Sequence, residues 1–171
     1  MGSPSHKSKK PLDTSLPPEK RLESTVFFVD RTLGRYKVPN ALRAAGIRVE
    51  VHHEHFVDNE LDTNWIEKCA EEGWVVLGND KNNKKNRYER AAIINGGVAA
   101  FYLTSGMRPG ENEAEAIIKA LKRIANLLMS EPRPFIARIH LDGRVELWVN
   151  HKDVDVLAAK EVRRHRKNKN K

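Results

Sequence analysis

Short apolar segments alternate along this chain with longer segments whose apolar residues recur at helical spacing, and this alternation limits the fold more than any other feature. The segment TVFFVD at Thr25–Asp30 is typical of a buried strand, whereas Asn112–Met129 repeats its apolar side chains every three or four residues, as a helix does. Strands are predicted at Thr25–Asp30, Ile47–Val51, Trp74–Leu77, Val98–Leu103, Phe135–Leu141 and Arg144–Val149, and helices at Val38–Ala45, Asp62–Glu72, Arg87–Asn95 and Asn112–Met129.

This order predicts an α/β fold with a mainly parallel central sheet of about four to five strands, flanked by helices. The dipeptide Asp142-Gly143 separates the last two predicted strands and is a strong hairpin signal, so a C-terminal β-hairpin is expected. In a parallel sheet, every strand-to-helix connection leaves from the carboxyl ends of the strands, where open α/β sheets carry their sites. Polar residues in those connections are therefore the first candidates for function.

Composition separates the ends of the chain from its body. Residues 1–24 are rich in Ser, Pro and Lys, and we predict a flexible arm there because so few apolar side chains cannot offset the entropy of ordering. The predicted domain covers residues 25–150, and a basic tail covers residues 151–171. No apolar run approaches the ~20 residues that span a membrane. We therefore expect no membrane association. The chain has one cysteine, Cys69, so no disulfide can form within it, and we expect a reducing, cytoplasmic location.

Positive charge is concentrated in two places. The net charge is +8; Arg163–Lys171 contributes +6, from six Lys or Arg, and Lys81–Arg90 contributes +4, from five Lys or Arg and Glu89, which leaves −2 elsewhere. Concentrated basic charge favours an anionic partner, nucleic acid first. A solubilising tail and a solvated loop are the alternative.

Three aspartates are expected at one edge of the predicted sheet. Asp30 ends the first strand, Asp80 follows the third strand, and Asp62 opens the helix after the second strand. Carboxylates that gather without a basic partner repel one another, and a hard divalent cation such as Mg²⁺ or Mn²⁺ resolves that repulsion. Such an ion activates water and stabilises charge during attack on a phosphodiester.

Each aspartate also has a structural alternative. Asp80 suits a turn, Asp62 suits a helix N-cap, and Asp30 suits a cap or an ion pair with Arg31 or Arg35. The imidazole-rich run His52–His55 suits Zn²⁺ or Ni²⁺, but no metal-binding motif accompanies it, and a polar loop over His52–Glu60 is the favoured interpretation.

Two runs, VFFVDRTLGRYKVPNALRAAGIRVEVHHEHF and LDTNWIEKCAEEGWVVLGNDK, resemble the PIN-like domains of VapC-type proteins. The resemblance covers roughly residues 25–130 and falls on the same three aspartates, Asp30, Asp62 and Asp80. It implies a Mg²⁺- or Mn²⁺-dependent ribonuclease, often the toxin of a toxin–antitoxin pair. The family commonly has a fourth acid, for which Glu60 and Glu89 are the candidates.

The family often has a Ser or Thr close before the third acid, where this chain has Gly78 and Asn79. From the aspartates at the sheet edge and from the resemblance together, we predict a metal-dependent endoribonuclease with Asp30, Asp62 and Asp80 as catalytic metal ligands. We expect its phosphates to be bound by four basic residues, Lys81, Lys84, Lys85 and Arg87. RNA, an antitoxin protein and a second copy of the chain are the expected partners. The alternatives are an inactive PIN-like nucleic-acid-binding module and a phosphoaspartate receiver.

Overall fold

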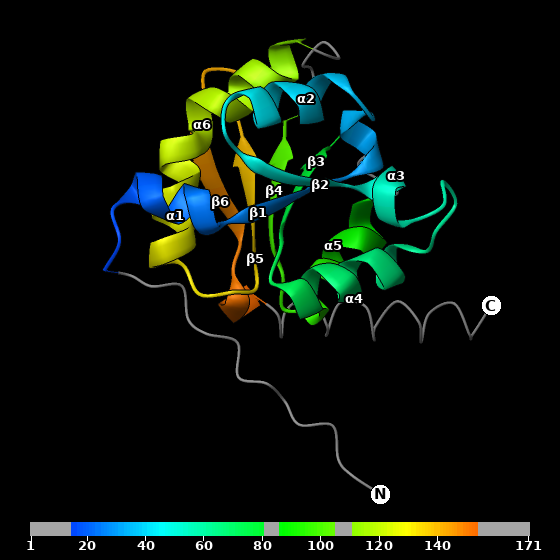
Figure 1. Cartoon of the computed structure of the whole chain (residues 1–171). Coiled ribbons are helices and arrows are strands. Elements are labelled where there is room, and N and C mark those ends of the chain that lie inside the picture. The colour runs from blue at the N-terminus through cyan, green and yellow to red at the C-terminus, as the bar shows by residue number, and fades with distance from the viewer. Residues whose placement is uncertain (1–14, 81–85, 105–110, 154–171) are drawn as a thin grey trace, which may run out of the picture.

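The computed structural model describes residues 15–80, 86–104 and 111–153, which form one sheet with helices on both faces (Figure 1). The strands are β1 (Val26–Val29), β2 (Arg48–Val51), β3 (Val75–Asn79), β4 (Ala99–Leu103), β5 (Phe135–Ile139) and β6 (Val145–Val149). The helices are α1 (Pro18–Ser24), α2 (Lys37–Ala44), α3 (His52–His55), α4 (Asp62–Glu72), α5 (Asn86–Asn95) and α6 (Glu111–Ser130), with 3₁₀ helices η1 (Arg31–Leu33) and η2 (His151–Asp153). The predicted α/β class is confirmed. The sheet has six strands, slightly more than expected, because the C-terminal hairpin of β5 and β6 joins it.

The strand order places a topological switch point beside β1. The order is β2-β1-β3-β4-β5-β6, with β1 to β5 parallel and β6 antiparallel. From β1 the chain moves to β2 on one side and then returns to β3 on the other side. Open α/β sheets bind their ligands outside the carboxyl ends of the strands at such a reversal. The fold therefore directs attention to the residues that follow β1 and β3.

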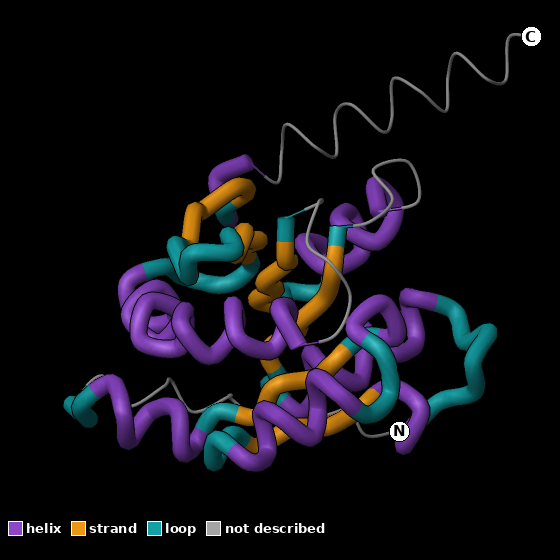
Figure 2. The backbone as a smooth tube through the Cα atoms, turned by 90° about the horizontal axis from the view of Figure 1, so that it is seen from above, coloured by secondary structure: helices purple, strands orange, loops and turns teal. Residues whose placement is uncertain are grey.

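The sheet is buried on both faces, which explains its nearly continuous apolar strands. Figure 2 shows it from above, with helices on either side. Phe27 lies in the core that α2 and α6 cover, and its neighbour Phe28 lies in the opposite core, under α4 and α5. Phe28 stacks on Trp65 and Trp74, at ring-centroid distances of 5.4 and 5.8 Å. Both tryptophans are thus core residues.

The prediction of a flexible arm over residues 1–24 is wrong for its last part. Residues Pro18–Ser24 form α1, with a proline in its first turn. Leu22 packs against the core, and Arg21 is only 5% exposed. The Thr25 hydroxyl donates to the Arg21 carbonyl at 2.8 Å and so closes the end of the helix. The sparse apolar content of this segment is sufficient because Leu22 packs against the core on the side of α6.

The polar loop predicted at His52–Glu60 is also wrong in part, because His52–His55 form the single turn α3. The Glu54 carboxylate accepts a hydrogen bond from the Val51 amide at 3.2 Å, which stabilises the start of the turn. His52 and Phe56 pack on Phe28, at ring distances of 6.1 and 6.3 Å. Burial of these rings therefore orders a segment that looks polar in the sequence.

Several sequence predictions lie outside the described residues. They are the loop that carries Lys81, Lys84 and Lys85 and the basic tail beyond Asp153. In the ranges that are described, no helix is both long and apolar enough to cross a membrane.

Candidate metal centre at the sheet edge

Two of the predicted aspartates lie at the switch point of the sheet. Asp30 follows β1 and Asp80 follows β3, the adjacent parallel strand. Their backbone amides continue the sheet, because Asp30 N donates to Leu77 O at 2.9 Å and Asp80 N donates to Leu103 O at 3.0 Å. Both residues are buried, with exposures of 3% and 7%. A carboxylate in such a place has lost most of its hydration and needs another source of stabilisation.

Thr32 connects these two strand ends. Its amide and its hydroxyl both donate to Asp30 Oδ2, at 3.2 and 2.7 Å, and its hydroxyl oxygen accepts from the Asn79 amide at 3.0 Å. Asp30 therefore caps η1, one of the structural roles that the sequence left open. The ion pair expected for Asp30 does not form with either arginine, since Arg31 contacts Asp62 and Arg35 contacts Asp58.

A buried glutamate that the sequence analysis missed, Glu113, lies next to this connection. The side-chain amide of Asn79 donates to Glu113 Oε1 at 2.6 Å, and both residues are about 2% exposed. Glu113 belongs to the first turn of α6, which follows β4. An acid that follows a strand and begins a helix is the same kind of signal that identified Asp80, and it could have identified Glu113. Helical periodicity did not reveal Glu113, because it concerns only the apolar residues of this segment.

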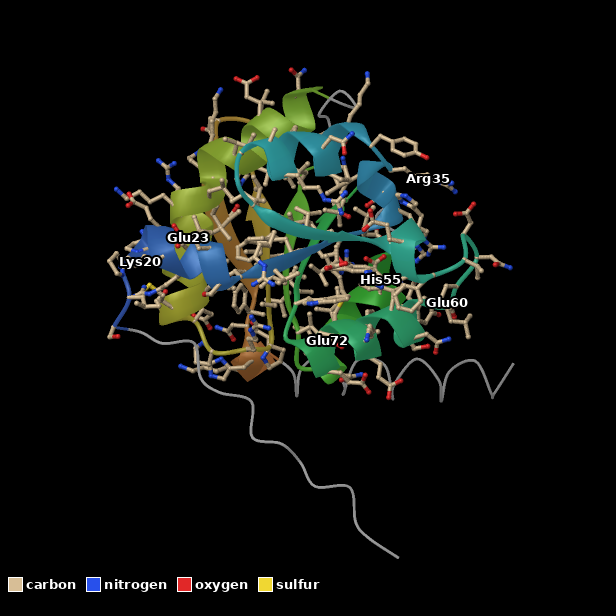
Figure 3. The ribbon with its side chains drawn as sticks, in the orientation of Figure 1. Lys20, Glu23, Arg35, His55, Glu60 and Glu72 are labelled. Carbon is tan, nitrogen blue, oxygen red and sulfur yellow. The ribbon has the colours of Figure 1, made fainter. Side chains whose placement is uncertain are left out.

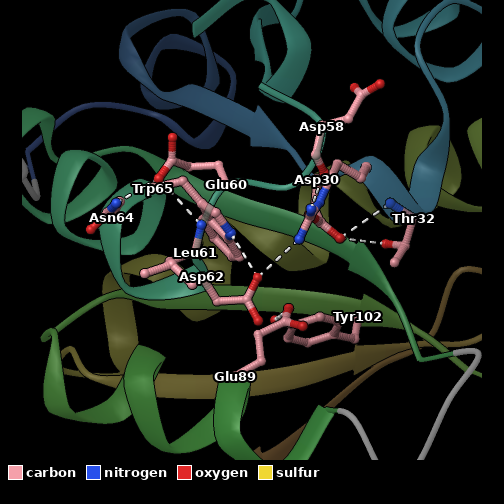
Figure 4. A network of polar contacts seen from close by, with 11 residues as sticks. Asp30, Thr32, Asp58, Glu60, Leu61, Asp62, Asn64, Trp65, Glu89 and Tyr102 are labelled. Carbon is pink, nitrogen blue, oxygen red and sulfur yellow. Dashed lines mark hydrogen bonds and ion pairs between the residues drawn. The ribbon is translucent and has the colours of Figure 1, made fainter. Parts of the chain in front are cut away.

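Asp62 reaches the site from α4. It is the first residue of that helix, and Leu61 is the N-cap, so the proposed N-cap role of Asp62 is wrong. Its carboxylate accepts from the Trp65 indole at 3.1 Å and pairs with Arg31 at 3.0 Å (Figure 4). Glu60 instead accepts from the Leu61 amide and the Asn64 side chain, which makes it part of the helix start.

Glu89 is the other candidate for a fourth acid, and it is buried below Asp62 in Figure 4. The Tyr102 hydroxyl donates to its carboxylate at 2.6 Å. Burial, together with the negative charges of Asp30 and Asp62, raises the pKa of Glu89 to about 7, against the opposing effects of the hydrogen bond from Tyr102 and the charge of Arg31. The pKa of Tyr102 is raised well above its usual value by burial and by Glu89.

The chemistry of these side chains suits a hard divalent cation. The charges of Asp30 and Asp62 both oppose ionisation of the buried Glu89, and this is a condition that a cation relieves. Their oxygens are the ligands that Mg²⁺ and Mn²⁺ prefer, and Mg²⁺ keeps several of its waters. Among the described residues, the three predicted aspartates do not form a group in which all three ligand atoms lie within 4.8 Å of one another. An ion bound partly through water fits this wider arrangement.

The tightest metal-capable group of the described chain lies elsewhere, on the surface near β2. There, ligand atoms of Glu50, Glu54 and His55 lie within 4.8 Å of one another. Arg43 donates to both oxygens of Glu54, at 3.0 and 3.1 Å. The three histidines do not form a joint site, since His52 is buried among aromatic rings and His55 pairs with Glu50 at 2.6 Å (Figure 3 labels His55).

The predicted phosphate-binding residues are only partly placed. Arg87 belongs to α5, the helix that also carries Glu89, while Lys81, Lys84 and Lys85 precede that helix outside the described residues. Their structural role therefore stays a prediction.

Comparison with known proteins agrees with this fold. Residues 25–105 match the family model described as a PIN like domain. The chain is also 34% identical over 118 residues to the protein named "Putative ribonuclease VapC45" of Mycobacterium tuberculosis, a match that covers 67% of this chain and 85% of the relative. No solved structure matches the chain. This chain belongs to the PIN-like family of VapC-type proteins.

The departure of the chain from the family pattern before Asp80 has a steric explanation. A Cβ atom at Gly78 would lie 2.7 Å from Cε1 of Tyr102, too close for any side chain. The ring of Tyr102 fills this space, and its hydroxyl donates to Glu89. The glycine therefore leaves room for the tyrosine that holds Glu89.

Proposed function

We propose that the protein is a metal-dependent endoribonuclease that hydrolyses RNA phosphodiester bonds. The observation that carries the proposal is the set of buried carboxylates at the switch point of the sheet, where Asp30 and Asp80 follow adjacent strands and Glu89 faces Asp30 and Asp62. Membership in a family that includes a protein named as a ribonuclease supports the same activity.

In this proposal Asp30, Asp62 and Asp80 hold Mg²⁺ or Mn²⁺, with Glu89 as the fourth acid. The bound ion supplies an activated water and stabilises the charge that develops on the phosphate. Thr32 orients Asp30 through two hydrogen bonds. Tyr102 orients Glu89. Because these side chains are held before substrate arrives, little reorganisation is needed when the RNA binds.

The remaining predicted residues bind the substrate. Lys81, Lys84, Lys85 and Arg87 follow Asp80 directly in the sequence, so their charges are suited to hold phosphates near the metal. Each phosphate that they neutralise on a single strand adds about 0.7 to the salt dependence of binding.

The test is cleavage of a single-stranded RNA by the full chain with and without Mn²⁺, beside Asp80→Asn. The matched control is Asp153→Asn, which removes one carboxylate after β6, an antiparallel strand that ends at the opposite edge. Metal-dependent cleavage that Asp80→Asn abolishes and Asp153→Asn retains is the expected result. Cleavage that survives in EDTA, or in purified Asp80→Asn, would overturn the assignment.

A second candidate is a PIN-like module that binds RNA without cleaving it. The ion pair between Arg31 and Asp62 favours it, because an arginine on a proposed ligand competes with a cation. RNA affinity that is equal with Mn²⁺ and with EDTA, in the absence of any cleavage, identifies this function instead. The receiver alternative has lost its support, because the match to the PIN-like family covers residues 25–105 and so includes Asp30.

Family membership also supports an antitoxin protein as a partner, while self-association as a homodimer stays a prediction. Co-purification with the product of an adjacent gene tests the first expectation, and the molar mass in solution tests the second.

A further inference from the structure

A pocket of about 250 Å³ opens beside the candidate metal centre and has no role in the proposal above. Its walls include Arg31 and Arg35 after β1, His52 and His53 after β2, and Asp58 from the following loop. Arg31 links it to the metal centre, because its guanidinium contacts Asp62 at 3.0 Å and also donates to the Asp58 carbonyl. A strand of RNA with one phosphate at the metal would therefore pass this pocket with an adjacent nucleotide.

Two imidazole rings form part of the pocket wall. Both ring nitrogens of His52 and Nδ1 of His53 are buried and have no hydrogen-bond partner among the described residues. Burial and the neighbouring Arg31 lower the pKa of His52, against the nearby carboxylates. A neutral imidazole beside the pocket presents a flat wall without positive charge.

Arg35 and Asp58 form a surface pair that a ligand can open. Arg35 donates to both oxygens of Asp58, and the two side chains are 50% and 72% exposed. Exposed ion pairs contribute little to stability, so exchange of one partner for a ligand costs little. The pair then presents a forked donor and a carboxylate acceptor side by side. Guanine is the base that matches both, because its O6 and N7 accept from arginine and its N1–H and N2–H₂ donate to a carboxylate.

An exposed aromatic ring borders the pocket. Tyr36 is 65% exposed, and its ring meets the His53 ring edge-on at 5.7 Å. Unpaired RNA bases are bound by stacking on aromatic rings or on guanidinium planes and by hydrogen bonds to their edges. A volume of about 250 Å³ is below the ~300–1,000 Å³ of pockets for drug-sized ligands, so it suits one base and not two.

We propose that this pocket binds a single unstacked guanine of the RNA, next to the bond that is cleaved, and so gives the enzyme its sequence preference. The inference rests on the proposed ribonuclease function for its biological meaning, but the binding itself can be measured without cleavage. Arg35 and Asp58 read the base, Tyr36 supplies a stacking surface, and His52 and His53 form the wall of the pocket.

The test measures binding of the full chain to two labelled hexanucleotides in EDTA, one of adenosines only and one with a single guanosine in the third position. The unmodified protein is expected to bind the guanosine oligonucleotide about tenfold more tightly, the size of one bidentate base contact. Arg35→Ala and Asp58→Asn should remove this preference. The control is Arg48→Ala, an equal loss of charge on an exposed residue at the opposite end of β2, which should leave the preference intact.

Equal affinity of the unmodified protein for both oligonucleotides would overturn the proposal. So would a preference that persists in both Arg35→Ala and Asp58→Asn, once circular dichroism shows that they are folded. Mapping of cleavage sites in Mn²⁺ separates the two proposals. Guanosine-selective binding without any cleavage refutes the nuclease and retains the pocket, whereas cleavage with no guanosine at a fixed distance from the cut refutes the pocket and retains the nuclease.

Discussion

Two regions of this molecule gather carboxylates, and they differ in how the charge is compensated. At the surface, Glu50, Glu54 and His55 bring ligand atoms within 4.8 Å, but Arg43 contacts both oxygens of Glu54. At the sheet edge the carboxylates lie farther apart, yet Asp30 and Glu89 are buried and repel each other.

The difference appears in the pKa values of the two regions. Burial acts to raise the pKa of Glu54, but hydrogen bonds from Arg43 and the Val51 amide hold it below its usual value. In Glu89, burial and neighbouring carboxylates together raise the pKa to about 7. The carboxylate of Glu54 is stabilised by Arg43, whereas Glu89 keeps a raised pKa in spite of the hydrogen bond from Tyr102 and the charge of Arg31. A cation would relieve a cost at the sheet edge that the surface group does not have, so short ligand distances alone do not favour the surface group as the metal site.

The largest expected effect that separates the regions is on catalysis. Asp30→Asn should lower the metal-dependent cleavage rate by about 100-fold or more, since even residues that only orient metal ligands cost ~10–100-fold. Glu54→Gln should leave the rate within about twofold, because its carboxylate already has a partner in Arg43. Initial rates with a fluorescent RNA measure both variants.

The unfolding free energy of the metal-free Asp30→Asn protein should stay within about 1 kcal/mol of the unmodified chain. The asparagine oxygen can still accept from Thr32, and a charge repulsion is removed. A large loss of stability in EDTA would mean that Asp30 serves the fold instead of the metal.

The next effect is a pH-dependent stability that Glu89 confers. Its pKa rises from 4.5 to about 7 on folding, so the stability it contributes is fully present below pH 4.5 and is lost as pH rises through 7. Glu89→Gln cannot ionise, so in EDTA it should exceed the unmodified protein in stability by up to about 3 kcal/mol at pH 8 and by almost nothing at pH 4.5. Urea unfolding at the two pH values measures the difference.

Addition of Mn²⁺ at pH 8 should reverse this order, because an ion that binds only the folded state stabilises it. The unmodified protein should gain more than Glu89→Gln does. An equal gain in both proteins would exclude Glu89 as a fourth acid.

The sequence identified the part of the site that depends on strand ends. Asp30 and Asp80 could be predicted because each directly follows an apolar segment, and parallel topology brings such positions to one edge. Asp62 was found from the start of a helix, although its contacts with Arg31 and Trp65 required the structure. The fold class was predictable for the same reason, since alternating strand and helix patterns define it.

The parts that could not be predicted depend on contacts between distant segments. The hydrogen bond between Asn79 and Glu113 joins residues 34 positions apart, and the sequence around either residue does not predict that it contacts the other. The helix α1 depends on Leu22 reaching a core built by later elements. The turn α3 depends on the burial of His52 and Phe56 against Phe28. Local propensity contains none of this information.

A smaller effect tests how tightly the buried region is packed. Gly78→Ala places a Cβ atom 2.7 Å from Cε1 of Tyr102 and must displace the ring. Overpacking of this kind typically costs about 1–3 kcal/mol. The same displacement should weaken the hydrogen bond to Glu89 and lower the cleavage rate. Thermal unfolding and rates measured on one preparation test whether the two losses occur together; a stable variant with reduced activity would mean that the ring moves without cost.

The smallest effect is expected at the surface group, where Arg43→Gln tests whether charge compensation is what keeps a cation away. The side chains of Arg43 and Glu54 are 42% and 37% exposed, so loss of their ion pair should cost less than about 1 kcal/mol of stability. It should also leave Glu54 uncompensated beside Glu50 and His55, and affinity for Ni²⁺, which imidazole and carboxylate ligands suit, should rise. Titration calorimetry in an Asp80→Asn background removes the contribution of the sheet edge, and His55→Gln added to Arg43→Gln should cancel the gain. If Arg43→Gln binds Ni²⁺ no better than its parent, ligand geometry and not the arginine limits the metal affinity of the surface group, and charge compensation does not explain the difference between the two regions.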